Sequence, residues 1–188
     1  LTVSFFGLAE PILGTLTVEE VEWTRATGVT ATLNSITRNI PGSQQLWNAG
    51  ATSTRALVSG EGYVEFSASP SPGAIAAGLS RGDDSLSYTD IDFAVLFWTN
   101  GTASAYESGQ WKASLGAYTT TDRFRVSVEG GKVKYWKNGA LLYQSTKTPE
   151  FPLLLDASID TTSGSINNAV IAGTGLGNAW PTLTVEDV

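Results

Sequence analysis

Turn-forming dipeptides divide residues 94–145 into short segments of similar length. They are Asn100-Gly101, Ser108-Gly109, Gly130-Gly131 and Asn138-Gly139. Asn and Gly adopt the positive φ angles of two-residue hairpin turns at little cost, so these dipeptides between strand-like segments indicate β-hairpins. We therefore predict a run of antiparallel hairpins over 94–145. Because no long stretch of the chain keeps a 3.6-residue apolar period, we also expect little or no helix.

Strand signals also lie outside this run. Apolar and polar residues alternate at 29–34 and at 63–68, which predicts two half-buried strands. Their predicted buried residues are Val29, Ala31 and Leu33 in one segment and Val64, Phe66 and Ala68 in the other. Residues 90–98 (DIDFAVLFW) are apolar on both parities after their two aspartates, as in a central strand that is covered on both faces. Further strands are expected near 54–58, 74–79, 153–158 and 165–171.

The number of short strands determines the fold class that we predict. A chain of 188 residues fits one domain, and its 41% apolar residues can build a large core. About a dozen short strands in one domain imply two packed layers, so we predict an all-β fold, a two-sheet antiparallel β-sandwich or jelly roll. We expect an apolar arm or extra strand at 1–14, the sandwich at 15–173, and a linker or strand at 174–188.

Several missing residue types exclude familiar enzyme chemistry. The sequence contains no Cys, Met or His, which removes disulfides, zinc sites with Cys or His ligands, and nucleophile systems that need an imidazole. The net charge of −7 argues against nucleic acid and anionic lipid as partners. No 18-residue apolar run is present, so we expect no membrane insertion.

The content of Ser, Thr and charged residues bears on location. The 42 Ser and Thr residues, with only 15% charged residues, are typical of all-β proteins outside the cell. We therefore expect an extracellular or cell-surface location, with a virion surface as the alternative. Because the sequence begins at Leu1 without an initiator Met, we expect a processed or excised segment.

One heptapeptide occurs twice. Residues 15–21 (TLTVEEV) recur as 182–188 (TLTVEDV), with six of seven positions identical. Coincidence, excision from a tandem array, and self-assembly by strand addition between neighbouring copies all explain the repeat. In the last case the apolar segment 1–8 could also join neighbours. The candidate assembly residues are Leu1, Val3, Phe5, Phe6, Leu16, Val18, Leu183 and Val185.

Several segments together resemble one known superfamily. They are 60–66 (GEGYVEF), 78–80 (GLS), 88–94 (YTDIDFA), 124–131 (FRVSVEGG), 133–139 (VKYWKNG) and 141–143 (LLY). These segments are similar to the concanavalin A-like lectin/glucanase superfamily, and more narrowly to the SPRY-like or laminin-G-like modules of bacterial cell-wall-anchored and secreted proteins. The resemblance implies a two-sheet jelly roll that acts as a non-catalytic glycan-binding or adhesive module, although some relatives are glycosidases or polysaccharide lyases.

Acidic residues provide candidates for catalysis and for a metal. Glycoside hydrolysis needs two carboxyl groups about 5–10 Å apart, and Asp90 with Asp92 would share one strand face. The competing interpretation is that Asp90 accepts hydrogen bonds from turn backbone. Asp83, Asp84 and Asp90 are candidate calcium ligands, since calcium prefers oxygen ligands from loops. We expect no catalytic residues and no obligatory cofactor, with calcium as the alternative.

Aromatic and basic residues provide candidates for ligand binding. We interpret Trp98 and Trp111 primarily as core residues, whereas Trp136 shares its parity with two lysines and should lie on a partly wet face. Five basic side chains at 123–137 form a positive stripe that would attract an anionic glycan or a neighbouring subunit, or would simply be a solvated face. The candidate ligand-binding residues are Trp136, Lys134, Lys132, Trp98, Tyr106 and Arg125.

The sequence therefore predicts a non-enzymatic extracellular recognition or adhesion module, with carbohydrate as the favoured ligand class. The main alternative is a structural subunit of a surface filament, layer or virion that joins copies of itself through terminal strands. A glycosidase or polysaccharide lyase is the minor alternative. The expected partners are a glycan or neighbouring surface-protein subunits, including a homopolymer.

Overall fold

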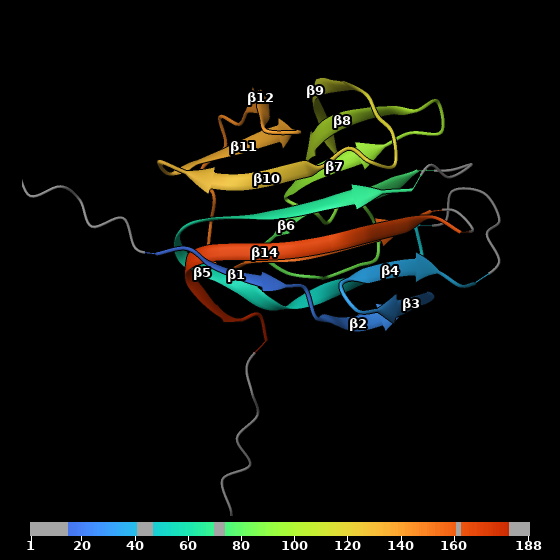
Figure 1. Ribbon diagram of the computed structural model, residues 1–188, viewed down its shortest axis with the longest axis horizontal. Coiled ribbons are helices and arrows are strands. Elements are labelled where there is room, and N and C mark those ends of the chain that lie inside the picture. Colours follow the sequence, from blue (N-terminus) through green and yellow to red (C-terminus); the bar gives the residue numbers. More distant parts are fainter. Residues whose placement is uncertain (1–14, 41–46, 70–73, 161–162, 181–188) are drawn as a thin grey trace, which may run out of the picture.

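The computed structural model describes residues 15–40, 47–69, 74–160 and 163–180 of the chain. In these ranges the chain forms β-strands joined by turns and loops (Figure 1). No helix long and apolar enough to cross a bilayer is found in the part of the chain that the structure describes. The predicted all-β fold is confirmed.

Fourteen strands make up the described structure, and they occur in chain order. They are β1 (Thr17–Glu20), β2 (Trp23–Thr27), β3 (Val29–Thr32), β4 (Ser35–Arg38), β5 (Gly50–Ala68), β6 (Ile75–Ser80), β7 (Phe93–Phe97), β8 (Thr102–Glu107), β9 (Gln110–Ala117), β10 (Phe124–Glu129), β11 (Lys132–Lys137), β12 (Ala140–Gln144), β13 (Leu153–Ile159) and β14 (Ser165–Asn178).

The two longest strands, β5 and β14, take part in both layers of the sandwich and pair with each other along most of their length. In the first layer the strand order is β12, β11, β10, the second half of β5, and β14. Strands β1 and β4 pair with the edge of β14 that faces away from β5. In the second layer, β9, β8, β7, β6 and β13 lead to the first half of β5, which also pairs with β2. All these pairings are antiparallel. Residue 173, the predicted end of the sandwich, falls inside β14.

The predicted hairpins are confirmed. Strands β7 and β8, β8 and β9, β10 and β11, and β11 and β12 pair as antiparallel neighbours. In the turn of β11 and β12, Asn138 and Gly139 have φ angles of 50° and 80°, and in that of β8 and β9, Ser108 and Gly109 have 46° and 77°. Two successive positive φ angles match the right-handed twist of the flanking strands, which explains the choice of these residues.

The main core lies between the two layers. Phe97 of β7 is fully buried, and its ring centroid lies 4.9 Å from that of Tyr118, 5.0 Å from that of Phe124 on β10 and 6.3 Å from that of Phe66 on β5. The edge-to-face angles of these pairs suit the ring quadrupoles. Residues from both sheets thus interdigitate around Phe97. The central strand predicted within 90–98 is present as β7 (Phe93–Phe97), which is buried at every position.

The two predicted alternating strands have different outcomes. Val64, Phe66 and Ala68 are buried, as predicted. The prediction for 29–33 is wrong beyond Val29, because Ala31 lies on the exposed part of β3 and Leu33 is 86% exposed. Leu33 has a φ of 52° in the tight turn that joins β3 to β4, so it leaves the strand before it can face the core.

One turn carboxylate makes folding stability depend on pH. Burial raises the pKa of Asp122, but hydrogen bonds from Asn138, the Thr119 amide and Lys137 outweigh it and lower this pKa from 3.8 to about 2. A depressed folded-state pKa stabilises the fold above the unfolded value, and this contribution disappears as the pH falls from about 4 to about 2. In urea unfolding, Asp122→Asn should be less stable than the wild type at pH 7, and the difference should vanish near pH 2. An equal difference between Asp122→Asn and the wild type at both pH values would contradict this assignment.

Candidate functional site

The outer face of the second layer carries a second apolar cluster. Along β6 and β7, alternate residues point away from the main core, and among them Ala76, Ala94 and Leu96 pack with Ile91 from the loop between these strands. The Ser158 hydroxyl on β13 also donates a hydrogen bond to the Leu86 carbonyl oxygen in this loop. The loop therefore lies over the outer face and holds its residues against small side chains.

A chain of aromatic rings lies at the border of this cluster. Trp47 and Tyr88 have ring centroids 4.7 Å apart, Tyr88 and Tyr106 are 5.9 Å apart, and Tyr106 and Trp98 are 6.1 Å apart. All four side chains are only partly buried. The rings pack against the apolar cluster and keep part of their surface exposed.

Trp111 extends this chain of rings. It lies opposite Tyr106 in the register of β8 and β9, and directly opposed residues of antiparallel strands share a sheet face. Trp111 is 59% exposed, so the prediction that it belongs to the core is wrong. The physical reason is a β-bulge between Trp111 and Ala113, which turns Trp111 to the outer face while Ala113 and Leu115 stay on the core side. We refer to the rings of Trp47, Tyr88, Tyr106, Trp98 and Trp111 as the aromatic rim.

Three aspartates meet at the far side of the same face. One carboxylate oxygen from each of Asp83, Asp90 and Asp156 lies within 4.8 Å of the other two. Asp156 on β13 lies opposite Gly78, which lies opposite Ala94, and Ala94 lies opposite Tyr106. One cross-strand row of the sheet therefore runs from the aspartate cluster to the aromatic rim.

The environments of these carboxyl groups differ. Asp90 accepts hydrogen bonds from the amides of Asp84 and Ser85 at 2.8 and 3.2 Å, so its predicted use by turn backbone is confirmed. Burial raises the pKa of Asp83, although the nearby Arg25 lowers it in part. Burial, followed by repulsion from Asp83 and Asp90, raises the pKa of Asp156 well above its usual range.

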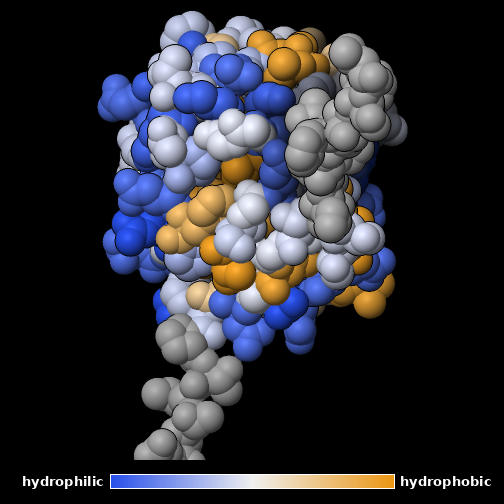
Figure 2. Space-filling model, turned by 90° about the vertical axis from the view of Figure 1, so that its left-hand side faces the viewer, coloured by the Kyte–Doolittle hydropathy of each residue, from blue (hydrophilic) through white to orange (hydrophobic). Residues whose placement is uncertain are grey.

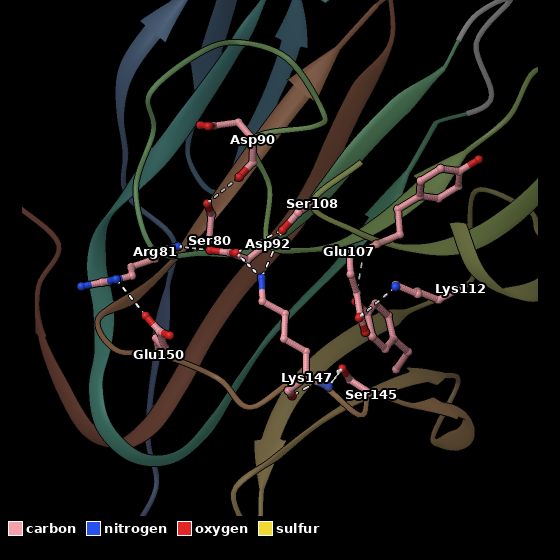
Figure 3. A network of polar contacts seen from close by, with 12 residues as sticks. Ser80, Arg81, Asp90, Asp92, Glu107, Ser108, Lys112, Ser145, Lys147 and Glu150 are labelled. Carbon is pink, nitrogen blue, oxygen red and sulfur yellow. Dashed lines mark hydrogen bonds and ion pairs between the residues drawn. The ribbon is translucent and has the colours of Figure 1, made fainter. Parts of the chain in front are cut away.

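Asp92 belongs to a different network, shown in Figure 3. Its carboxylate accepts hydrogen bonds from Lys147 Nζ at 2.6 Å and from the Arg81 amide at 3.0 Å, with Ser108 Oγ at 3.4 Å. In that view the Asp90 carboxylate points away from the Asp92 carboxylate. The two residues therefore do not face one ligand together, in contrast to the strand pattern, because Asp90 lies in the loop before β7 begins.

A surface pocket between β2 and the loop has one member of the aspartate cluster, Asp83, in its lining. Its volume is about 410 Å³, and its lining comprises 25–27 from β2 and 83–86 from the loop. Arg25 lies at this pocket with its guanidinium 3.5 Å from the ring centroid of Trp180 and 3.8 Å from the Asp83 carboxylate. The pocket thus combines a cation stacked on a ring with a partly buried carboxylate.

Comparison with solved structures bears on this arrangement. The carbohydrate recognition domain of Emp46p in its potassium-bound form has a TM-score of 0.57 at 15% identity over 81% of this chain and 88% of that domain. The alginate lyase AlgAT5 from Polysaccharide Lyase family 7 has a TM-score of 0.50 at 10% identity over 82% of each chain. The sialidase of Trypanosoma rangeli has a TM-score of 0.54 at 8% identity. The match covers 86% of this chain and 30% of the sialidase.

The chain has the concanavalin A-like β-sandwich fold. This confirms the fold that the resemblance implied. No protein-family model matches the sequence, and no curated protein matches it either. At these identities the similarity shows the fold alone. What this concanavalin A-like sandwich binds must therefore be argued from its own side chains.

The predicted ligand-binding residues do not form one site in this concanavalin A-like sandwich. Trp98 and Tyr106 belong to the aromatic rim. Trp136, Lys134, Lys132 and Arg125 lie on the first layer, on the sheet face opposite the core residues Val133 and Tyr135. There the Trp136 indole donates a hydrogen bond to Ser127 Oγ at 2.9 Å, and the Arg125 guanidinium lies 3.8 Å from the ring centroid of Tyr63.

The predicted positive stripe of the first layer is largely neutralised. Glu65 on β5 forms ion pairs with Arg123 at 3.2 Å and with Arg125 at 2.8 Å. Lys134 pairs with Glu129 at 3.0 Å, and Lys137 pairs with Asp122 at 3.2 Å. The sequence interval 123–137 does not contain Glu65, which comes from β5. The net charge of this face could therefore not be predicted from that interval alone. Among the described ion pairs, Lys132 takes part in none.

The remaining predicted residues belong to neither the aromatic rim nor the aspartate cluster. Leu16 and Val18 are exposed, and β1 pairs with β14 along one of its edges. Asp84 contributes its amide to Asp90 and is absent from the aspartate cluster. The other assembly candidates, Leu1, Val3, Phe5, Phe6, Leu183 and Val185, lie outside the described residues.

Proposed function

We propose that the chain is a non-enzymatic carbohydrate-binding module that acts outside the cell, with its glycan across the aromatic rim. The observation that carries this proposal is the continuous line of partly exposed rings from Trp47 to Trp98, continued by the exposed Trp111. Ring faces offer apolar area to the C–H faces of a sugar, and polar groups at the same site fix its orientation.

The support beneath the rim favours this use. Four of its rings pack against the cluster of buried Ala76, Ala94 and Leu96, so their positions are set before any ligand arrives; they are Trp47, Tyr88, Trp98 and Tyr106. A preorganised site loses little conformational freedom on binding, which favours affinity. The carbohydrate recognition domain among the structural neighbours agrees with this ligand class.

Loss of the exposed ring should weaken glycan binding. A glycan array would select ligands, and calorimetry would then measure their affinity. Removal of a Trp from a binding hot spot costs about 2 kcal/mol or more, so Trp111→Ala should reduce the affinity at least about tenfold. Because this side chain is mostly exposed, the variant should keep the unfolding free energy of the wild type.

Trp136→Ala is the matched control, since this Trp lies on the other layer. It should bind the selected glycan as the wild type does. The opposite result, loss with Trp136→Ala and none with Trp111→Ala, would move the site to the first layer. No binding at millimolar glycan would refute the carbohydrate proposal, and release of shortened sugar products would refute its non-enzymatic part.

The position of β1 favours a second candidate function, a self-assembling surface subunit. Strand β1 carries the first copy of the repeated heptapeptide and pairs with β14 through a short register, while Leu16 and Val18 are exposed. A strand of the same sequence from another copy could use the same kind of edge. Hydrophobic residues form several separate patches on the face in Figure 2, and not one broad apolar surface.

Sedimentation would separate the two candidate functions. The full chain and a form that lacks residues 1–14 are compared over a range of concentrations. Concentration-dependent polymers of the full chain that are lost on truncation would support assembly. A monomer in both forms would remove this candidate and leave recognition alone.

A further inference from the structure

The aspartate cluster of Asp83, Asp90 and Asp156 brings together more negative charge than its described neighbours neutralise. The only described ion pair of the three is that of Asp83 with Arg25, at 3.8 Å. Arg25 is also held by its stacking on Trp180, which keeps the guanidinium on the pocket side. Two further carboxyl groups therefore share a small volume without a cationic side chain.

Asp156 makes this cluster unlike an ordinary surface group of acids. It lies within β13 and is only 4% exposed, and its Oδ2 atom has no hydrogen-bond partner among the described residues. A buried carboxylate oxygen without a donor carries a large desolvation cost, and buried charges in proteins are normally paired or bound to metals. A group that supplies positive charge at this point would remove that cost.

The sequence around Asp156 offers no structural reason for an acid. Its neighbours on the strand, Leu155 and Ala157, point into the main core, and Gly78 lies opposite it on β6. A hydrophobic or amide residue of similar size would fit between the sheet and the loop without an unsatisfied charge. The presence of an acid at position 156 is thus best explained by the carboxylates beside it, those of Asp83 and Asp90.

We propose that Asp83, Asp90 and Asp156 form a calcium site between β13 and the loop that joins β6 to β7. All ligands are carboxylate oxygens, which hard cations prefer. Opposite oxygen ligands of calcium lie about 4.6–5.2 Å apart, so oxygens within 4.8 Å of one another can contact one ion. Asp83 also lines the surface pocket, so this ligand can be reached from solvent.

The same arrangement gives calcium a structural effect on the outer face. Asp83 and Asp90 belong to the loop that also carries Tyr88 and Ile91, whereas Asp156 belongs to the sheet. An ion shared by both would fix this loop onto the sheet and hold Tyr88 in the aromatic rim. The site does not depend on the proposed glycan, and calcium alone is the probe that tests it.

Calorimetry with calcium chloride on the chelator-treated chain tests the proposal. We expect one calcium ion per chain. Asp156→Asn should weaken binding at least tenfold, because it removes the buried ligand charge while it keeps the size of the side chain. Glu20→Gln on exposed β1 is the control, since it removes one acidic charge outside the cluster and outside the pocket, and it should bind within about twofold of the wild type by the scale of surface charge effects. Absence of binding at millimolar calcium, or equal affinity of Asp156→Asn and the wild type, would overturn the site.

Thermal unfolding gives a second readout that does not depend on calorimetry. Calcium should raise the melting temperature of the wild type and leave that of Asp156→Asn unchanged, because a ligand stabilises only the form that binds it. In chelator, Asp156→Asn should melt at or above the wild type, since it lacks the buried charge. A variant that melts well below the wild type in chelator would show that the carboxylate has a structural partner of its own, and would refute the proposal. Stabilisation by magnesium alone would refute calcium as the ion.

Discussion

Phe97→Ala should produce the largest loss of stability among single substitutions in this chain, about 3–5 kcal/mol. The ring is fully buried and contacts three other aromatic rings from both layers. Truncation leaves a cavity in the middle of the sandwich, which the rigid sheets can fill only in part. Equilibrium unfolding in urea, followed by tryptophan fluorescence, measures the difference.

Leu33→Ala provides the comparison for this prediction. It removes a similar apolar side chain from a position that is 86% exposed, so its effect should stay within about 0.5 kcal/mol. If the Phe97→Ala loss were also below about 1 kcal/mol, the inner faces of the two layers would not form one shared core as described. A loss that exceeds the total stability would appear as an unfolded chain and would agree with the prediction.

Gly78→Ala should destabilise the fold by about 3 kcal/mol or more, at the upper end of what overpacking costs. A Cβ atom at this position would lie 1.9 Å from the Phe93 carbonyl oxygen and 2.9 Å from the Ala94 Cα atom. Both are backbone atoms of β7, which is buried at every position and cannot move aside easily. The glycine is therefore required by the close approach of two strands.

Gly82→Ala is the matched control for this substitution. No atom lies within 4 Å of the added Cβ, and the position needs no positive φ. It should be neutral or stabilise the protein by up to about 1 kcal/mol, because alanine restricts the unfolded chain. Equal losses for the two variants would mean that loss of backbone freedom, and not the contact with β7, explains the effect.

The fold could be predicted because its signals are local. The dipeptides at 108–109 and 138–139 specify hairpin turns by their own φ preferences, and the apolar run at 93–97 can satisfy both faces only in a covered strand. Leu33 shows where prediction from alternation fails. Alternation predicts which face a residue would take within a strand, but it does not show where the strand ends.

The candidate site was less accessible to prediction because it depends on which strands become neighbours. Asp156 lies in the apolar segment 153–159, where sequence alone gives no reason to connect it with Asp83 or Asp90. The exposure of Trp111 follows from a β-bulge in β9, which interrupts the alternation on which the parity argument depends. Parity placed Trp136 on a wet face correctly, yet it could not show that Trp98 and Tyr106 lie on the other layer.

The long strands β5 and β14 have a mechanical consequence for the molecule (Figure 1). Since each of them contributes backbone hydrogen bonds to both sheets, neither sheet can melt while the other stays whole. A denaturant or a pulling force must break the ladders of β5 and β14 before the two layers can separate from each other. The sandwich should therefore unfold in a single cooperative step, and a protease should find either the intact module or a fully open chain.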